Sequence, residues 1–208
     1  MAKDAAAGCA YLHQSTYYDE KEGVYHDCII HRDLKPDNML VTTTYGIKLT
    51  DFGEARVMDS EMTMTQVGSP VYMAPEVLKG ERYDERIDIY SYAITLLEML
   101  VLAESVFEVF EKSFKKLKGE DAVLTPLALT RLVALENFRP DLPANIPKSL
   151  SDLIKACWSQ NPNSRPNFEA ILERLDGEIH EEIYNTDWEN MVRICPGEGE
   201  FIVFGLFF

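Results

Sequence analysis

The sequence predicts a mainly α-helical domain built around one buried helix, with a small β-hairpin nearer its start. The buried helix is residues 87–102 (IDIYSYAITLLEMLVL), which are apolar almost all round, as in a helix at the centre of a domain. The hairpin is predicted by two β-rich runs, residues 39–43 and 47–49, joined by a short turn at 44–46. With 208 residues and 46% apolar content, the chain can bury a core.

The other elements follow from local patterns. Residues 5–13 contain strong helix formers with an apolar stripe, which predicts a helix. Residues 14–27 (QSTYYDEKEGVYHD) are polar and contain Gly23, which favours an exposed loop. Residues 53–68 have few large aliphatic side chains, so we expect a mobile loop that could act as a switch. Further helices, separated by prolines, are expected at residues 106–118, 128–135, 150–158 and 168–175.

Composition excludes several classes of function. The formal net charge of -15 argues against nonspecific binding to nucleic acid or anionic lipid, because both depend on basic patches. The four cysteines form no CxxC pair, so neither a zinc site nor a disulfide framework is indicated. No signal peptide is recognisable, and the apolar run at 201–208 is too short for the roughly 20 residues of a membrane helix. We therefore expect a soluble chain, cytoplasmic by default with the nucleus left open, that contacts neither nucleic acid nor membrane.

Five motifs occur in the order found in protein kinases. The run IIHRDLKPDNMLV (29–41) resembles the catalytic loop, and TDFGEA (50–55) follows it at the spacing of a hairpin. GSPVYMAPEVL (68–78) resembles the substrate-binding loop that ends in APE, and the buried helix resembles the central helix of the family. CWSQNPNSRPNF (157–168) resembles the last conserved segment, in the form typical of the tyrosine-kinase-like group. The chain is thus similar, over residues 5–175, to the C-terminal lobe of a eukaryotic serine/threonine protein kinase.

The resemblance implies roles in phosphoryl transfer for five residues. Asp33 would accept or orient the proton of the substrate hydroxyl, and Lys35 would place a positive charge on the transferred phosphoryl group. Asn38 and Asp51 would offer two oxygen ligands to Mg²⁺, which keeps the rest of its shell for water and phosphate. Leu40 would lie under the adenine ring. ATP and Mg²⁺ are therefore the expected cofactors.

Other matching residues would shape the site rather than react. His31 and Phe52 would pack into the spine that aligns the catalytic loop. Glu76 and Arg165 occupy the positions of a buried ion pair, which is costly to break because it strands a charge. Asp88 would hold the backbone of the catalytic loop, and an ordinary helix N-cap is the alternative interpretation.

Further residues suggest the substrate and its regulation. Lys35, together with Ser69 before the APE motif, resembles the serine/threonine pattern, so protein Ser and Thr hydroxyls are the expected substrates. The Ser69 hydroxyl could bridge the catalytic aspartate and lysine. Arg32 could receive a phosphate from the activation loop, with Thr63 and Thr65 as candidate acceptors. Exposed loop hydroxyls are more often unmodified, and this alternative stays open.

The sequence also departs from the complete family pattern. A whole kinase has a β-rich N-terminal lobe whose glycine-rich loop and lysine grip the phosphates, and neither can be placed here. GEGEFIVFG (197–205) resembles such a loop in spacing, and we interpret it as coincidence. Residues 1–175 are therefore interpreted as the C-terminal lobe alone, and 176–208 as an unassigned acidic to apolar tail. We expect the isolated chain to be inactive without an N-lobe or regulatory partner. The alternative is a noncatalytic binding or scaffold module.

Overall fold

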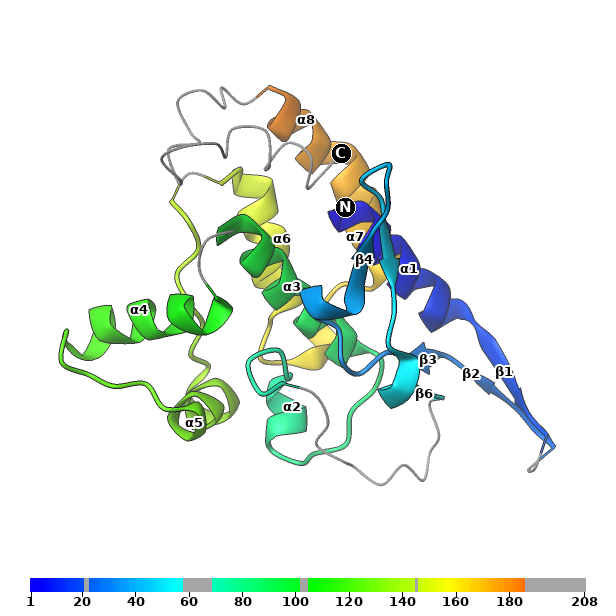
Figure 1. Ribbon diagram of the computed structural model, residues 1–208, viewed down its shortest axis with the longest axis horizontal. Helices are drawn as coiled ribbons and strands as arrows, with labels where there is room; N and C mark the ends of the chain where they lie inside the picture. The colour runs from blue at the N-terminus through cyan, green and yellow to red at the C-terminus, as the bar shows by residue number, and fades with distance from the viewer. Residues whose placement is uncertain (21–22, 58–68, 102–104, 145, 186–208) are drawn as a thin grey trace.

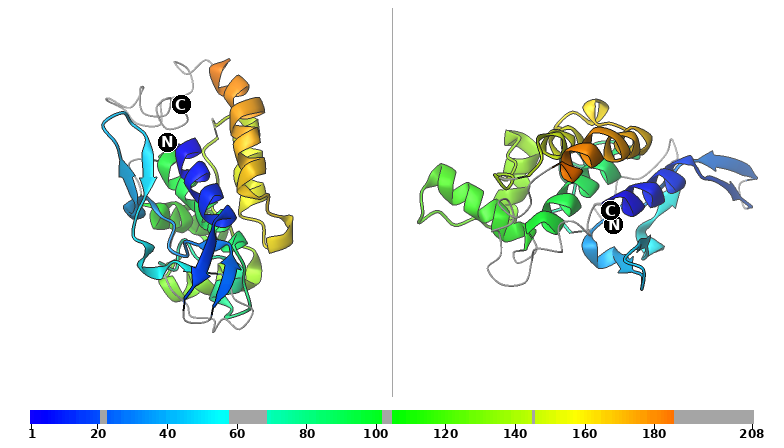
Figure 2. Two further views of the ribbon diagram at one scale, coloured as in Figure 1. Left: turned by 90° about the vertical axis from the view of Figure 1, so that its right-hand side faces the viewer. Right: turned by 90° about the horizontal axis from the view of Figure 1, so that it is seen from above.

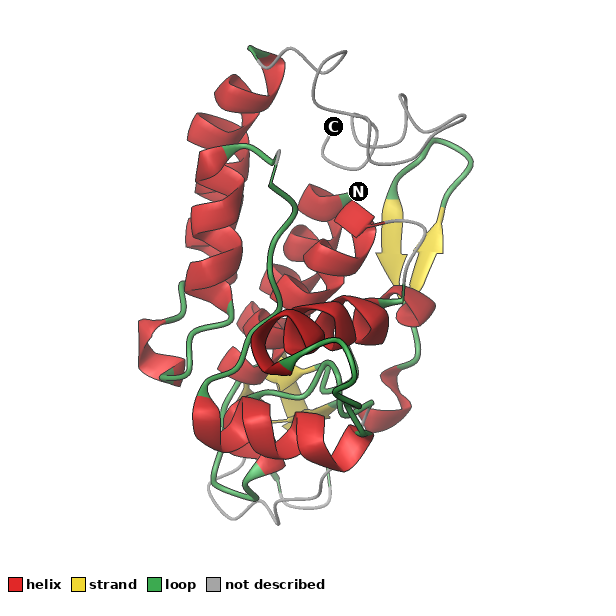
Figure 3. Cartoon of the chain, turned by 90° about the vertical axis from the view of Figure 1, so that its left-hand side faces the viewer, coloured by secondary structure: helices red, strands yellow, loops and turns green. Residues whose placement is uncertain are grey.

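The computed structural model describes residues 1–20, 23–57, 69–101, 105–144 and 146–185. These residues form a mainly helical body with three small two-stranded sheets (Figure 1). Helices make up most of the molecule (Figure 3), and the strands lie on the right-hand side in the view of Figure 1. The prediction of a mainly α-helical fold with a small hairpin is therefore confirmed for the described residues.

The centre of the core is helix α3 (Arg86–Val101), which the apolar run predicted. Most of its side chains are buried, including Tyr90, Tyr92, Ile94 and Leu97, none of which is measurably exposed. Helix α6 packs directly against it. A helix buried on nearly all sides needs apolar residues on nearly all sides, which is why periodicity alone located it.

The other predicted helices also form, with small shifts at their ends. Helix α5 begins earlier than predicted because Thr125 accepts a hydrogen bond from the Ala128 N–H and Pro126 fills the first helical position. It ends at Asn137, whose backbone is left-handed. The bounds are α1 (Ala2–Gln14), α4 (Val106–Lys118), α5 (Pro126–Glu136), α6 (Lys148–Cys157) and α7 (Phe168–Arg174).

Helical structure continues after α7 into the region that the sequence analysis left unassigned. After α7 come a π-helical turn, η4 (Leu175–Ile179), and α8 (His180–Tyr184). Ile183 is buried in the core, and the Glu182 carboxylate accepts hydrogen bonds from the backbone N–H groups of Lys148 (2.7 Å) and Ser149 (2.8 Å). The extension up to α8 is therefore part of the helical body. The rest of the tail, including the 197–205 segment, lies outside the described residues.

The strands pair as three antiparallel ribbons. The predicted hairpin forms, and Met39 pairs with Leu49, Leu40 with Lys48, and Val41 with Ile47. It places the segment after the 3₁₀ turn η1 (Pro36–Asn38) beside the segment that leads to Asp51. The strands are β1 (Thr16–Asp19), β2 (Val24–Asp27), β3 (Ile29–Ile30), β4 (Met39–Val41), β5 (Ile47–Leu49) and β6 (Arg56–Val57).

One loop prediction was wrong, and a second was wrong over its first five residues. Residues 14–27 are not a loop, because β1 and β2 form a ribbon there. Both faces of this ribbon are largely exposed, so it lacks the apolar alternation that usually indicates a strand. Residues 53–68 begin with the end of a 3₁₀ turn, η2 (Phe52–Glu54), followed by β6, which pairs with β3. This pairing joins distant parts of the chain and has no local signal, and residues 58–68 lie outside the described residues.

Short elements complete the body. They are the 3₁₀ turns η1 (Pro36–Asn38) and η3 (Pro162–Ser164) and the one-turn helix α2 (Pro75–Leu78). Helix α2 packs against α5. Within the described ranges, no helix has both the length and the apolar character needed to cross a membrane.

The three described cysteines, Cys9, Cys28 and Cys157, are free thiols. Cys9 and Cys157 are buried, and burial raises the pKa of both, that of Cys157 to about 12. Burial, and then the nearby carboxylates beginning with Glu85, raise the pKa of the half-buried Cys28 to about 12. All three thiols therefore stay protonated near neutral pH and are poor nucleophiles.

Candidate active site

The site is built on the loop between β3 and β4, residues 31–38, which is fixed to the core by Asp88. One carboxylate oxygen of Asp88 accepts a hydrogen bond from the His31 N–H (2.8 Å), and the other accepts one from the Arg32 N–H (2.9 Å). Asp88 is buried and is the third residue of α3. Its carboxylate thus ties the loop to the central helix, and these bonds are not those of an N-cap.

The backbone at the site is held in an unfavourable conformation at two positions. Arg32 has φ of 70° and Asp51 has φ of 58°, both in the left-handed region that side-chain-bearing residues seldom adopt. Such residues cost on the order of 1–3 kcal/mol each and persist where the surroundings fix them. At Arg32 the restraint is the hydrogen bond that its N–H donates to Asp88. At Asp51 it is the hydrogen bond that the carboxylate accepts from the Gly53 N–H at 3.4 Å.

At the centre of the loop, Asp33 is surrounded by donors. Its Oδ2 accepts hydrogen bonds from Lys35 Nζ (2.6 Å) and from Asn38 Nδ2 (2.9 Å). The Asp33 and Lys35 side chains are 11% and 21% exposed, so both are shielded yet reachable from solvent. The loop therefore presents one oriented carboxylate and one ammonium group side by side.

The residues predicted to bind a metal are brought to neighbouring positions. Asn38 Nδ2 donates to both the backbone oxygen (2.7 Å) and the carboxylate of Asp33, which leaves the Asn38 side-chain oxygen outside these bonds. The Thr50 N–H donates to the Asn38 backbone oxygen at 3.0 Å, so the residue before Asp51 is tied to Asn38. Asp51 is exposed. An amide oxygen and a carboxylate from adjacent segments are the hard ligands that Mg²⁺ accepts, so the residues fit this ion.

Apolar side chains next to this polar centre are unusually exposed. Leu40 is 59% exposed, Val41 59% and Phe52 48%. The Phe52 ring contacts His31, with ring centroids 5.4 Å apart, and the His31 Nε2 lies 3.1 Å from the Thr50 oxygen. His31 itself is fully buried. Exposed apolar side chains therefore lie next to the polar centre of the site in the described part of the chain.

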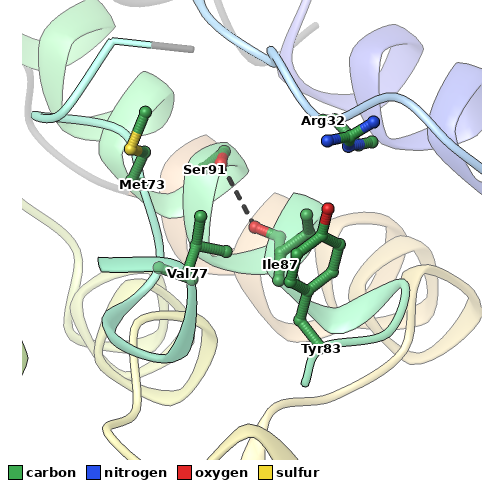
Figure 4. A pocket seen from close by; sticks show the side chains of 7 residues that line it. Arg32, Met73, Val77, Tyr83, Ile87 and Ser91 are labelled. Carbon is green, nitrogen blue, oxygen red and sulfur yellow. Dashed lines mark hydrogen bonds between the residues drawn. The ribbon is translucent and has the colours of Figure 1, made fainter. Parts of the chain in front are cut away.

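Arg32 lines two adjoining small pockets that also include Met73 and Ser91. Figure 4 shows the first, of about 10 Å³, where Arg32 lies across from Val77 and above Tyr83. The Arg32 guanidinium is 5.9 Å from the centroid of the Tyr83 ring. This volume holds about one water molecule, so the pocket is a contact zone rather than a ligand cavity.

Ser69 lines the second small pocket together with Asp33, Leu34 and Tyr72. Among the described residues, no hydrogen bond joins the Ser69 hydroxyl to Asp33 or Lys35, which contact each other directly. The bridge suggested by the sequence is thus not formed in this structure. The candidate phosphate acceptors Thr63 and Thr65 lie outside the described residues.

A buried ion pair between Arg165 and Glu76 links segments that are far apart in the sequence. Arg165 donates from both terminal nitrogens to the two carboxylate oxygens of Glu76, at 2.6 and 2.8 Å, and also donates to the Arg86 backbone oxygen at 2.9 Å. Both side chains are buried. The pair thus joins α2 to the segment after η3 and to the start of α3.

Three side chains near the site were missed from the sequence. His13 Nε2 lies 2.9 Å from Asp88 Oδ2, so α1 contacts the same carboxylate as the loop. The Asp4 carboxylate accepts the Ile47 N–H at 3.2 Å and thereby holds the edge of β5. A tyrosine hydroxyl, Tyr72, donates to Glu98. Burial, and then the hydrogen bond to Glu98, raise the pKa of the Tyr72 hydroxyl above its ordinary value. None of these contacts has a local sequence signal, since each joins distant segments.

Comparison with known proteins follows this geometry. A family model described as protein kinase domain matches residues 2–175. The dual specificity protein kinase shkA of Dictyostelium discoideum is 34% identical over 181 residues, covering 85% of this chain and 30% of that protein. In the same organism, the RGS domain-containing serine/threonine-protein kinase A is 35% identical over 186 residues (89% and 14%), and the dual specificity protein kinase shkD is 36% identical over 178 residues (85% and 21%). The chain spans less than a third of the length of each of these relatives.

Proposed function

The chain belongs to the protein kinase family, and from this premise we propose that it provides the phosphoryl-transfer half of a serine/threonine protein kinase. One observation carries the proposal. A single carboxylate oxygen of Asp33 accepts hydrogen bonds from both Lys35 and Asn38 in a loop that Asp88 fixes to the core. Phosphoryl transfer depends mainly on positioning and on charge neutralisation, and this arrangement supplies both.

Each residue of the loop has a distinct task in this proposal. Asp33 accepts or orients the proton of the attacking hydroxyl, and such assistance is typically worth about 10² to 10⁴ in rate. The Lys35 ammonium, 2.6 Å from Asp33 Oδ2, is placed to stabilise negative charge on the transferred phosphoryl group. The Asn38 amide donates one hydrogen bond to the Asp33 backbone oxygen and one to its carboxylate, and the two together keep the carboxylate in one orientation.

The metal and the nucleotide would occupy the side of the loop that faces Asp51. The Asn38 side-chain oxygen and the Asp51 carboxylate would hold Mg²⁺, and Leu40 would lie under the adenine ring of ATP. When bound, the ion neutralises charge on the phosphates. The Asp51 carboxylate accepts a hydrogen bond from the Gly53 N–H at 3.4 Å, which restrains its direction. Both ligands are therefore preorganised by their own segments.

We further propose that residues 1–175 act as a C-terminal lobe that works together with a β-rich lobe. The exposed Leu40, Val41 and Phe52 support this proposal, because apolar side chains beside a polar centre usually have a covering layer. His31 and Phe52 would then belong to the spine that crosses between the lobes. The chain by itself should be inactive, because no glycine-rich loop covers the nucleotide side among the described residues.

Serine and threonine hydroxyls are the proposed acceptors, in the tyrosine-kinase-like group. Lys35 and Ser69 support this choice, and Ser69 lines the pocket that Asp33 reaches. Two of the relatives are named dual specificity kinases, so tyrosine peptides belong in the test. Arg32, beside that pocket, is the proposed partner of a phosphate on Thr63 or Thr65.

The first experiment measures metal binding, because it does not require turnover. Mn²⁺ with ATP should broaden the NMR signals of residues near Asn38 and Asp51, and Asp51→Asn should weaken this binding about tenfold or more. Asp37→Asn is the matched control. Asp37 is exposed in the η1 turn, next to Asn38, and has no assigned role. Equal binding by Asp51→Asn and wild type would refute the metal site and favour the noncatalytic scaffold.

The second experiment measures phosphoryl transfer from ATP to serine, threonine and tyrosine peptides. We expect no turnover by the 208-residue chain alone. Turnover that Asp33→Asn abolishes would contradict the proposal that the chain needs a second lobe, and would at the same time support the role of Asp33. Transfer to tyrosine peptides alone would contradict the proposed acceptor.

A further inference from the structure

The β1–β2 ribbon projects from the body beyond the end of α1 (Figures 1 and 2). Its register pairs Thr16 with Asp27, Tyr17 with His26, and Tyr18 with Tyr25. In the described part of the chain it forms a sheet of its own with no third strand. A lone two-stranded ribbon is only marginally stable in water, so this element gains from a partner surface.

The ribbon presents aromatic side chains to solvent. Tyr18 and Tyr25 form a cross-strand pair with ring centroids 4.8 Å apart, and they are 46% and 74% exposed. Tyr17 and Val24 are also exposed, and by strand alternation they lie on the opposite face. Exposed apolar residues scattered singly need no explanation, but each face of this short ribbon carries two of them.

Hydrogen-bonding groups are also available along the ribbon's edges. The Cys28 N–H donates to the Ser15 oxygen at 3.0 Å, so Ser15 and Cys28 are a hydrogen-bonded pair. Along an antiparallel ribbon, hydrogen-bonded and non-hydrogen-bonded pairs alternate. Counting from this bond, Tyr18 and Tyr25 are a non-hydrogen-bonded pair, whose own N–H and C=O groups point outward. An extended segment could therefore pair with either edge and place its side chains against the tyrosines.

The charge of the ribbon and of its base is negative. Glu20 and Asp27 are exposed on the ribbon itself. At its base, Asp84 and Glu85 act together with Asp27 on the Cys28 thiol, whose pKa their charges raise further after the larger effect of burial. A second copy of this chain, with its formal charge of -15, would bring like charge to this place. A basic partner would meet complementary charge.

We propose that the β1–β2 ribbon is a docking element for a basic, extended segment of another protein. The segment adds as a strand at an edge of the ribbon. Its arginine or lysine side chains stack on Tyr18 and Tyr25 and approach the carboxylates of Glu20 and Asp27. Guanidinium groups favour aromatic faces, so arginine is the preferred cation. This binding does not depend on phosphoryl transfer.

The test uses the 208-residue chain and a fluorescent eight-residue peptide of alternating arginine and valine, followed by anisotropy at physiological salt. Tyr18→Ser/Tyr25→Ser should raise the Kd about tenfold, from the loss of two cation–aromatic contacts. The matched control is Tyr11→Ser/Tyr184→Ser, which removes two tyrosines outside the ribbon that are at least about as exposed as Tyr25 and more exposed than Tyr18, and it should leave the Kd unchanged. Tyr18→Phe/Tyr25→Phe keeps the rings and should retain binding.

Three outcomes would overturn the proposal. The first is equal binding by the two serine double variants, which would mean that the peptide responds only to net charge. The second is equal binding of a peptide with glutamate in place of arginine. The third is a dimer, detected by sedimentation, that Tyr18→Ser/Tyr25→Ser dissociates, because the ribbon would then pair with a second copy. An unchanged thermal transition in each variant shows that lost binding is not lost folding.

Discussion

Glu76 and Arg165 are 89 residues apart in the chain and form a two-pronged ion pair in the core. Arg165 also lies over one face of the Tyr90 ring, at 5.3 Å, while Arg139 lies over a face of the same ring at 5.1 Å. Two guanidinium groups thus contact one tyrosine, and Glu76 is the carboxylate that neutralises one of them. The pair is therefore central to the packing of α2 and the end of the domain against α3.

We predict that Glu76→Gln lowers the free energy of unfolding by about 3–5 kcal/mol, because it leaves the Arg165 charge buried without its counter-charge. Urea denaturation measures this. Glu81→Gln is the control, since Glu81 is exposed and its contact with Lys79 spans 3.7 Å, and it should change stability by less than about 0.5 kcal/mol. A loss below about 1 kcal/mol for Glu76→Gln would contradict the importance of the pair.

Asp88→Asn should loosen the 31–38 loop without removing a residue that contacts the substrate. An asparagine side chain can accept only through its oxygen, so one of the N–H groups of His31 and Arg32 would face an NH₂ group. We expect a loss of about 2–4 kcal/mol in stability and faster amide exchange at these two residues. Asp121→Asn, at an exposed position, should have neither effect. Unchanged exchange at His31 would show that Asp88 does not hold the loop.

The contact between α1 and β5 predicts a coupling between Gly8 and Leu49. A Cβ atom at Gly8 would lie 3.0 Å from Leu49 Cδ1, so Gly8→Val should push the hairpin away and cost about 1–3 kcal/mol. Ala7→Val on the exposed side of the same helix should cost only a few tenths of a kcal/mol, as roughly expected from helix propensity. The double variant with Leu49→Ala should lose less stability than the sum of the single changes. Simple additivity would argue against this contact.

Stability should depend on pH through Glu182. Hydrogen bonds from Ser149, and from the Lys148 backbone, hold the pKa of the Glu182 carboxyl below its ordinary value. A lowered pKa in the folded state means that the contribution is present above the unfolded pKa of about 4.3 and is lost as the pH falls through the folded pKa. Glu182→Gln should therefore destabilise the chain at pH 7, and the gap to wild type should narrow in acid.

Urea titrations at several pH values test this prediction. At pH 7 the loss should be about 0.5–2 kcal/mol, as for other residues that cap the start of a helix. Glu181 is the exposed neighbour of Glu182 in the sequence. For Glu181→Gln, the plot of unfolding free energy against pH should run parallel to that of wild type. A gap that widens in acid would have the wrong sign for a carboxylate acting in its charged form.

Local sequence patterns were sufficient for the longer helices and for nominating the residues of the candidate site. The 87–102 run predicted α3 because a fully buried helix must be apolar on all sides. The run from His31 to Asn38 indicated the loop, since its side chains meet through bonds between near neighbours, such as Lys35 to Asp33. Turn and cap chemistry of this kind is written into a few adjacent residues.

Contacts between distant segments could not be predicted in this way. The sequence contains both His13 and Asp88, but nothing near either residue shows that they lie 2.9 Å apart. The β1–β2 ribbon was missed for a different reason. Strands are recognised by burial on one face, and this ribbon exposes tyrosines on both, so its pattern looked like that of a loop.

By itself, the sequence determined the helical class and the order of the longer helices, and it nominated a group of residues for phosphoryl transfer, because these inferences depend on periodicity and on short motifs. The tertiary structure decided how Asp88 restrains the loop at Arg32, whose backbone is left-handed. It also decided how Glu76 neutralises Arg165 and that the β1–β2 ribbon projects from the body. These features require segments far apart in the chain to meet. Their energy comes from burial and charge pairing that exist only after the chain has folded.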